Sequence, residues 1–101
     1  MENVITITDQ DLKELIAEGK TTIVDFYAEW CGPCKVLGPV LDKVAAENPE
    51  IQIIKVNVDE NEELSAEFGI RNIPSVFIFK NGEQTDKFVG MKSKEDILKL
   101  I

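Results

Sequence analysis

The chain alternates between two patterns of apolar residues. In some segments β-branched and aromatic residues follow one another, which is typical of strands that helices cover on both faces. In others apolar residues recur every three or four positions, which indicates helices with one buried stripe. These patterns predict strands at 4–7, 22–28, 51–58 and 75–79, and helices within 9–19 and at 33–48, 61–68 and 93–101. A hairpin signal after the fourth strand leads to a fifth at 85–89.

Turn-forming and capping residues mark the ends of these elements. Thr8 or Asp9 is expected to cap the first helix, and Gly19 to end it. Asn81-Gly82 is a strong signal for a two-residue hairpin between the last two strands. Ser93 opens a sequence that resembles a capping box at the start of the last helix. The expected order of elements is therefore β-α-β-α-β-α-β-β-α.

This order predicts an α/β fold. Strand–helix–strand crossovers imply parallel pairing with right-handed connections, and the hairpin adds an antiparallel pair at the end. We therefore expect a three-layer α/β/α sandwich around a central mixed five-stranded sheet. The 101 residues suit a single domain that spans 1–101.

Charge and composition exclude several classes of function. The formal net charge is −8, with 19 acidic and 11 basic residues, which opposes binding to a nucleic-acid backbone. No apolar run approaches the ~18 residues of a transmembrane helix, so no membrane partner is expected. The first residues resemble no signal peptide, which suggests the cytoplasm, where thiols stay mostly reduced. The chain has no histidine, so Cys-His catalysis is excluded.

Cys31 and Cys34 are the only cysteines, and they lie where an apolar strand ends and a helix begins. Residues three apart lie on one face of a helical turn, close enough for two sulfurs to bond reversibly. Free N–H groups at a helix start favour the thiolate, which is the form that attacks disulfides. Closing so small a ring stabilises the fold little, so a purely structural bridge is the poorer explanation. A metal shared between two chains remains an alternative, because zinc requires four ligands.

Three segments and one pair of residues closely resemble the thioredoxin family. They are 24–35, which contains Trp-Cys-Gly-Pro-Cys-Lys, 70–75, 79–83 and Val89-Gly90, and the likeness covers essentially the whole chain. The resemblance implies a thioredoxin fold. It also implies a general protein-disulfide reductase and dithiol electron carrier, a thiol-disulfide oxidoreductase that a separate reductase recycles. The departures are small: Tyr27 stands where many relatives have Trp, and Ser75 where many have Thr.

The two cysteines are expected to have different roles. Cys31 precedes Gly32 and Pro33 and should be the exposed nucleophile at the helix end. Cys34 lies a turn inward and should be the buried thiol that resolves the mixed disulfide, because burial disfavours its thiolate. Pro33 suits the first helical turn and stiffens the segment between the cysteines.

Asp25 and Lys55 are the expected proton-handling residues. Asp25 interrupts an apolar strand, where burial should raise its pKa, although a hydrated position near the strand end is the alternative. The resemblance implies that Asp25 accepts and donates the proton of Cys34. It also places Lys55 near Asp25, where it modulates that transfer; otherwise Lys55 extends past a strand end into water.

The resemblance implies a substrate-binding surface around Cys31. It predicts a cis Ile73–Pro74 bond facing the cysteines, with the Ile73 backbone free to pair with an extended substrate segment. The alternatives are a strand-start proline with no partner and a core position for the tryptophan. Gly90 is expected to allow close backbone approach. The expected surface comprises Trp30, Gly32, Pro33, Ile73, Pro74, Val89 and Gly90.

The expected partners are disulfide-containing protein substrates and a separate thioredoxin reductase. The chain has no Gly-x-Gly-x-x-Gly segment and no room for a flavin or nicotinamide domain, so no cofactor is expected. The protein is expected to be a monomer. Disulfide formation or isomerisation, and a non-catalytic role as a subunit of an assembly, are the competing interpretations.

Overall fold

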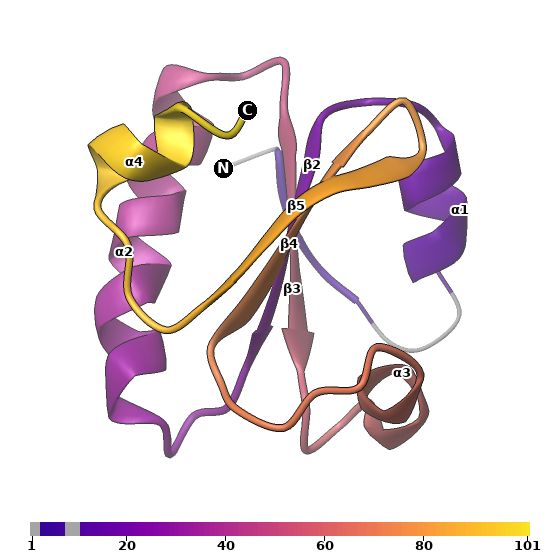
Figure 1. Cartoon of the computed structure of the whole chain (residues 1–101), viewed down its shortest axis with the longest axis vertical. Helices are drawn as coiled ribbons and strands as arrows, with labels where there is room; N and C mark the ends of the chain where they lie inside the picture. The colour runs from indigo at the N-terminus through magenta and orange to yellow at the C-terminus, as the bar shows by residue number, and fades with distance from the viewer. Residues whose placement is uncertain (1–2, 8–10) are drawn as a thin grey trace.

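The structure is a computed structural model that describes residues 3–7 and 11–101. Thr8 and Asp9, the expected caps of the first helix, lie outside the described residues. In the described part of the chain, five strands form one sheet in the order β1-β3-β2-β4-β5 (Figure 1). The elements are β1 (Val4–Thr6), α1 (Leu12–Ala17), β2 (Thr22–Tyr27), α2 (Gly32–Glu47), β3 (Gln52–Asn57), α3 (Glu62–Glu67), β4 (Ser75–Lys80), β5 (Glu83–Val89) and α4 (Lys94–Leu98). The expected order of elements is confirmed.

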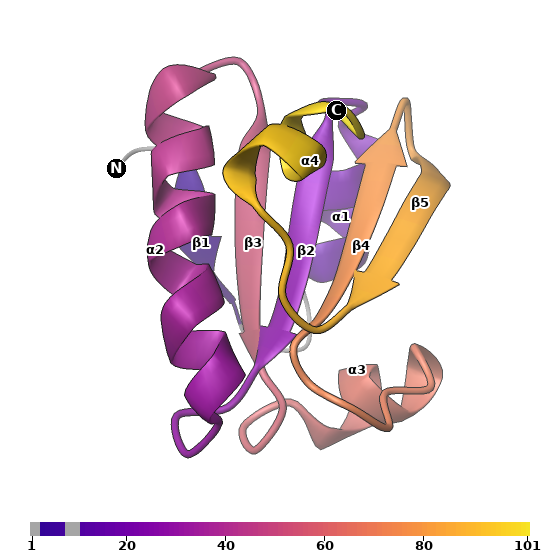
Figure 2. The same cartoon turned by 60° about the vertical axis from the view of Figure 1, so that its left-hand side comes forward.

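The sheet is mixed, as expected, but one pairing differs from the expectation. Strands β1 and β2 both run parallel to β3. Strand β4 is antiparallel to β2, although a strand–helix–strand crossover precedes it. The reason is that α3 lies beyond the end at which β3 finishes, so the chain enters β4 from that same end (Figure 2). The hairpin then adds β5 antiparallel to β4.

Helices cover both faces of the sheet, with α2 and α4 on one side and α1 and α3 on the other (Figure 1). Successive side chains of a strand point to opposite faces, so each strand contributes to two apolar cores. Ile23 of β2 packs in the core beneath α2 and α4, and Val24 packs in the core beneath α1 and α3. Asp25 has the same parity as Ile23, which directs it toward α2.

Local sequence signals set the ends of several elements as predicted. Asn81 and Gly82 have φ values of 55° and 81°, which are the positive values that a two-residue hairpin requires. The Ser93 side chain accepts a hydrogen bond of 3.1 Å from the Asp96 N–H, which caps α4. None of the helices within 3–7 and 11–101 combines the length and apolar character needed to cross a bilayer.

Candidate active site

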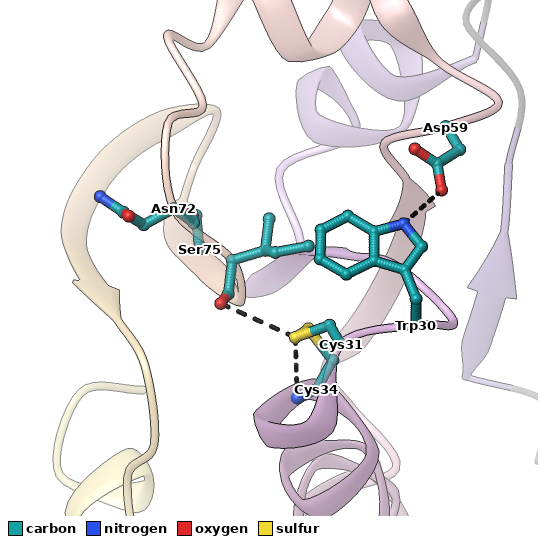
Figure 3. Close-up of a disulfide and its surroundings, with 7 residues drawn as sticks. Trp30, Cys31, Cys34, Asp59, Asn72 and Ser75 are labelled. Atoms are coloured by element: carbon teal, nitrogen blue, oxygen red, sulfur yellow. Dashed lines mark hydrogen bonds between the residues drawn. A yellow bond between two sulfur atoms is a disulfide. The ribbon is translucent and has the colours of Figure 1, made fainter.

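The two cysteines lie at the N-terminus of α2, directly after the loop that follows β2. Cys31 is the N-cap residue, with an extended backbone, and Pro33 lies in the first turn of the helix. The Cys31 Sγ accepts a hydrogen bond of 3.2 Å from the backbone N–H of Cys34. The two side chains form a disulfide, with Cα atoms 5.3 Å apart (Figure 3). The structure is therefore that of the oxidised protein.

The expected difference in exposure between the two cysteines is not found in this oxidised state. Cys31 is 4% exposed and Cys34 is 6% exposed, so the expectation of an exposed Cys31 is wrong here. The disulfide packs with Ala28 and against the partly buried Ile73, which shields both sulfurs. The two sulfurs differ instead in their polar surroundings: Cys31 faces the helix N-terminus, whereas Cys34 borders the cavity that contains Asp25.

The loop before β4 lies against the disulfide. The Ile73–Pro74 bond is cis, as the resemblance implied. The carbonyl oxygen of Ile73 is 3.7 Å from the Cys31 Sγ. At its other side the loop is tied to the end of β5, because the Gly90 N–H donates a hydrogen bond of 2.8 Å to the Pro74 carbonyl. The Ser75 hydroxyl donates to the Asn72 carbonyl and closes the turn.

Trp30 is a surface residue next to the disulfide. It is 70% exposed, so the alternative of a core position is excluded. Its indole Nε1 donates a hydrogen bond of 2.8 Å to Asp59 Oδ2, as Figure 3 shows. The Asp59 N–H in turn donates 2.9 Å to Asn57 Oδ1 at the end of β3. These hydrogen bonds link the exposed indole to the end of β3.

Gly90 and Val89 complete the edge of the site beside the cis loop. Val89 is 52% exposed, as a surface role requires. A Cβ at Gly90 would meet nothing within 4 Å among the described residues, so no contact within the protein requires glycine there. The close backbone approach expected of Gly90 at the site stays a prediction. Glycine is favoured at this position because its φ is +90°, a conformation that residues with a side chain rarely adopt.

Asp25 is buried, as expected, in the wall of the cavity that Cys34 also borders, and the alternative of a solvent-exposed carboxyl at the strand end is excluded. It is 2% exposed, and its Oδ1 has no hydrogen-bond partner within the described residues. Burial raises the pKa of Asp25 to about 7; the Lys55 charge opposes this rise and the Asp42 charge adds to it. The side chain can therefore exchange a proton near neutral pH.

Lys55 lies on β3 directly beside Asp25 in the register of the sheet. Its Nζ is 3.1 Å from Asp42 Oδ1 of α2, so it does not simply extend into water. These side chains border a cavity of about 490 Å³ that reaches from the surface to Cys34 and Asp25. The cavity is lined by Asp25, Tyr27, Ala28, Glu29, Cys34, Lys35, Gly38, Pro39, Asp42 and Lys55.

Comparison with known proteins identifies the family. The model of the family described as thioredoxin matches residues 3–101. The chain belongs to the thioredoxin family. It is 43% identical to thioredoxin of Rickettsia felis over 94 residues, 91% of this chain and 90% of that protein. It is also 43% identical to thioredoxin of Chlamydia muridarum over 98 residues, 96% of this chain and 95% of that protein.

A solved structure of the thioredoxin family has the same fold. A mutant thioredoxin from Halobacterium salinarum NRC-1 matches with a TM-score of 0.89 and 33% identity, over 99% of this chain and 88% of that one. This chain is therefore a thiol–disulfide oxidoreductase that reduces protein disulfides, and Cys31–Cys34 is its redox-active disulfide.

The disulfide shows what the two cysteines do in this structure. Both sulfurs are bonded to each other, which is the arrangement that thiol–disulfide exchange requires. Within residues 3–7 and 11–101, no group of three or more cysteine, aspartate or glutamate side chains could hold a metal ion in a single chain.

Two carboxylates of this site were missed by sequence reasoning. Asp59 follows the end of β3, and β3 is parallel to the strand that leads to Trp30, so both residues lie at one edge of the sheet. Asp42 follows Cys34 by eight residues, which is a helical spacing that places both on one face of α2. Both positions could have pointed to these contacts, but only with the register of the sheet and the orientation of α2 already known.

Proposed function

We propose that Cys31 is the nucleophile of this thiol–disulfide oxidoreductase and that Cys34 resolves the mixed disulfide. The hydrogen bond from the Cys34 N–H to the Cys31 Sγ, 3.2 Å long, carries this assignment. In the reduced protein the same N–H, together with the positive end of the sixteen-residue helix α2, favours a thiolate at Cys31. Cys34 has no such donor among the described residues and borders the cavity beside buried Asp25.

The proposed reaction has two exchange steps. First, the Cys31 thiolate attacks one sulfur of the substrate disulfide; that disulfide breaks, a mixed disulfide forms, and the departing sulfur leaves as a thiolate that takes a proton from water. Second, Cys34 gives its proton to Asp25 and its sulfur attacks Cys31. The mixed disulfide breaks, the Cys31–Cys34 bond forms, and the second substrate sulfur leaves as a thiolate that takes a proton from water. Two electrons pass from the dithiol of the protein to the substrate.

Asp25 is the proposed proton acceptor for the second step. Its burial raises its pKa to about 7, so it is substantially ionised at neutral pH and yet binds a proton readily. The cavity that it shares with Cys34 gives room for a bridging water. Lys55 is proposed to modulate the transfer through its charge, which acts to lower the pKa of Asp25.

The proposed binding surface surrounds the disulfide. The exposed Trp30 and Val89 offer apolar contact area, and the Ile73–Pro74 turn faces the Cys31 sulfur. An extended substrate segment would pair with the Ile73 backbone and bring its disulfide to Cys31. Gly32 and Pro33 complete this surface at the helix start.

The proposed partners are proteins with accessible disulfides and a thioredoxin reductase that returns two electrons to Cys31–Cys34. We propose that the chain works in the cytoplasm as a single-domain monomer spanning 1–101, without a bound cofactor. The family match over 3–101 supports the single domain, and the reducing direction of the reaction suits a compartment that keeps thiols reduced. Bacterial thioredoxins among its relatives support the same setting.

Trapping of the mixed disulfide tests the assignment. Reduced Cys34→Ser protein mixed with insulin should accumulate a mixed disulfide through Cys31, which non-reducing electrophoresis and mass spectrometry detect. The matched Cys31→Ser protein should trap little, and a protein with both substitutions sets the background. Trapping by Cys31→Ser but not by Cys34→Ser would reverse the two roles. Failure of the unsubstituted protein to reduce insulin would refute the reductase function.

A further inference from the structure

The cavity beside the disulfide brings together more polar and ionisable side chains than the proposed reaction uses. Strand β2 contributes Asp25 and Tyr27, the loop after it contributes Glu29, helix α2 contributes Cys34, Lys35 and Asp42, and strand β3 contributes Lys55. Asp25 and Cys34 already have proposed proton-transfer roles, and Lys55 a modulating one. Asp42 has no proposed role, although its carboxylate binds the ammonium group of Lys55, the residue that pairs with Asp25 in the register of the sheet.

Asp42 holds Lys55 at the outer end of this cavity. The Lys55 Nζ donates to Asp42 Oδ1 over 3.1 Å. The side chain of Lys55 is 20% exposed and that of Asp42 is 40% exposed, whereas Asp25 is 2% exposed. The ion pair is therefore closer to solvent than the buried carboxyl of Asp25, and all three side chains line the same cavity. Within 3–7 and 11–101, no ion pair joins Lys55 to Asp25, although the two are neighbours in the sheet register.

Helix α2 is built so that Lys55 can reach Asp42. Cys34, Gly38 and Asp42 are spaced by four residues and form one stripe of the helix that faces the cavity. A Cβ at Gly38 would lie 3.9 Å from the Lys55 Nζ. A larger side chain at position 38 would therefore fill the space through which Lys55 extends to Asp42.

We propose that Asp42 is a positioning residue for the exchange reaction: it binds the Lys55 ammonium at the outer end of the cavity and so leaves Asp25 without a cationic partner. This inference rests on the proposed role of Asp25. The Asp25 Oδ1, which has no hydrogen-bond partner within the described residues, is the group that such an arrangement leaves open to receive a proton. An Asp25 paired with Lys55 would be a weaker base, because an opposite charge stabilises the carboxylate.

Removing the Asp42 carboxylate should lower the pKa of Asp25 in two ways. It releases Lys55, whose nearest remaining carboxylate in the cavity is that of Asp25 or Glu29, and it removes a negative charge that raises the pKa of Asp25. A close opposite charge lowers the pKa of a carboxyl by about 1–3 pH units, so the downward shift in Asp42→Asn should be about one pH unit or more. If Asp42 acted only through its own charge, Asp42→Asn would lower the pKa of Asp25 by the same amount whether Lys55 is present or replaced.

The test is a titration of the Asp25 carboxyl carbon by NMR in the oxidised protein, which needs no turnover. The variants are Asp42→Asn, Lys55→Gln and the two combined, with Asp42→Glu as the conservative replacement. Glu47→Gln is the matched control, because Glu47 is also a carboxylate of α2 that binds a lysine, at 2.8 Å from the Lys94 Nζ. The NMR spectra report in the same experiment whether each variant is folded.

The expected result is a lower Asp25 midpoint in Asp42→Asn, a higher one in Lys55→Gln, and a much smaller effect of Asp42→Asn when Lys55 is already replaced. The Asp25 midpoint in Asp42→Glu should stay near that of the unsubstituted protein, and the midpoint in Glu47→Gln should equal it. An unchanged midpoint in Asp42→Asn, or an equal decrease in the Lys55→Gln background, would overturn the positioning role.

The role of Asp25 is measured separately, as the rate at which Cys34 resolves a preformed mixed disulfide across pH. If the NMR midpoint moves in Asp42→Asn while the rate profile does not follow it, Asp25 is not the proton acceptor and Asp42 has no part in the exchange. If both move together, the positioning role and the proposed proton transfer are supported together. The two failures are thus distinguishable: an unchanged NMR midpoint refutes the positioning role of Asp42 alone, whereas a rate profile that does not follow the midpoint refutes the proton-transfer role of Asp25 and the positioning role with it.

Discussion

The buried carboxyl of Asp25 should make the protein less stable as pH rises, and Asp25→Ala should remove this loss. Asp25 stays protonated in the folded protein up to about pH 7, whereas in the unfolded chain it ionises above about 3.8. Between these values the unfolded state binds fewer protons than the folded state, so the free energy of unfolding decreases with rising pH. Relative to low pH, where Asp25 is protonated in both states, the free energy of unfolding decreases by about 1 kcal/mol at about pH 4.5 and by about 4 kcal/mol at about pH 8.

The assay is urea denaturation of oxidised Asp25→Ala and unsubstituted protein, followed by circular dichroism across this pH range. Packing lost with the carboxyl group contributes equally at every pH, so the change in the stability difference isolates the ionisation. That difference should shift by about 3 kcal/mol in favour of Asp25→Ala between about pH 4.5 and about pH 8. Asp86→Ala is the matched control, because Asp86 is an exposed strand aspartate, and its stability difference should stay nearly constant.

A stability difference that does not change with pH would refute this reasoning. It would mean that Asp25 ionises in the folded protein as easily as in the unfolded chain. The carboxyl would then be solvated or paired, and its proposed use as a base near neutral pH would lose its physical basis.

Three further predictions concern the packing and the rim of the site. Leu37→Ala should lower the free energy of unfolding by about 2–5 kcal/mol in urea titrations, because Leu37 is a fully buried residue of α2, whereas replacing its exposed neighbour in Val36→Ala should change it little. Gly90→Ala should lower the free energy of unfolding by about 1–2 kcal/mol, because the positive φ at this position is unfavourable for a residue with a side chain; an unchanged urea midpoint would contradict this. Asp59→Ala should free the Trp30 indole, which lowers its fluorescence anisotropy and raises the KM for insulin; a motionally unchanged indole would show that the hydrogen bond does not hold it.

Local signals were sufficient to predict most of the fold. The hairpin at Asn81-Gly82 and the cap at Ser93 depend on residues that act within one turn, and both are confirmed. The boundaries of β2 and β4 follow from continuous apolar runs, whereas β5 is a largely polar and exposed strand that only the hairpin signal before it indicated. The antiparallel direction of β4 was not predictable in this way, because it depends on where α3 lies relative to the sheet.

The parts of the site that single residues reveal by their type and position could be predicted from the sequence. The spacing of Cys31 and Cys34 and the polar Asp25 within an apolar strand both stand out in the sequence. The contacts of Asp59 with Trp30 and of Asp42 with Lys55 do not, because each joins side chains from two elements. The burial of the Cys31 sulfur has the same origin, since a distant loop covers it.

The relative reactivity of the two thiols in the reduced protein most directly tests the claim that Cys31 is the nucleophile and Cys34 the resolving thiol. Iodoacetamide should be added at neutral pH, and the label on each cysteine followed in time by mass spectrometry of peptides. We predict rapid labelling of Cys31, whose sulfur faces the helix N-terminus, and very slow labelling of Cys34 beside the cavity. Equal and slow labelling of both cysteines would contradict the claim.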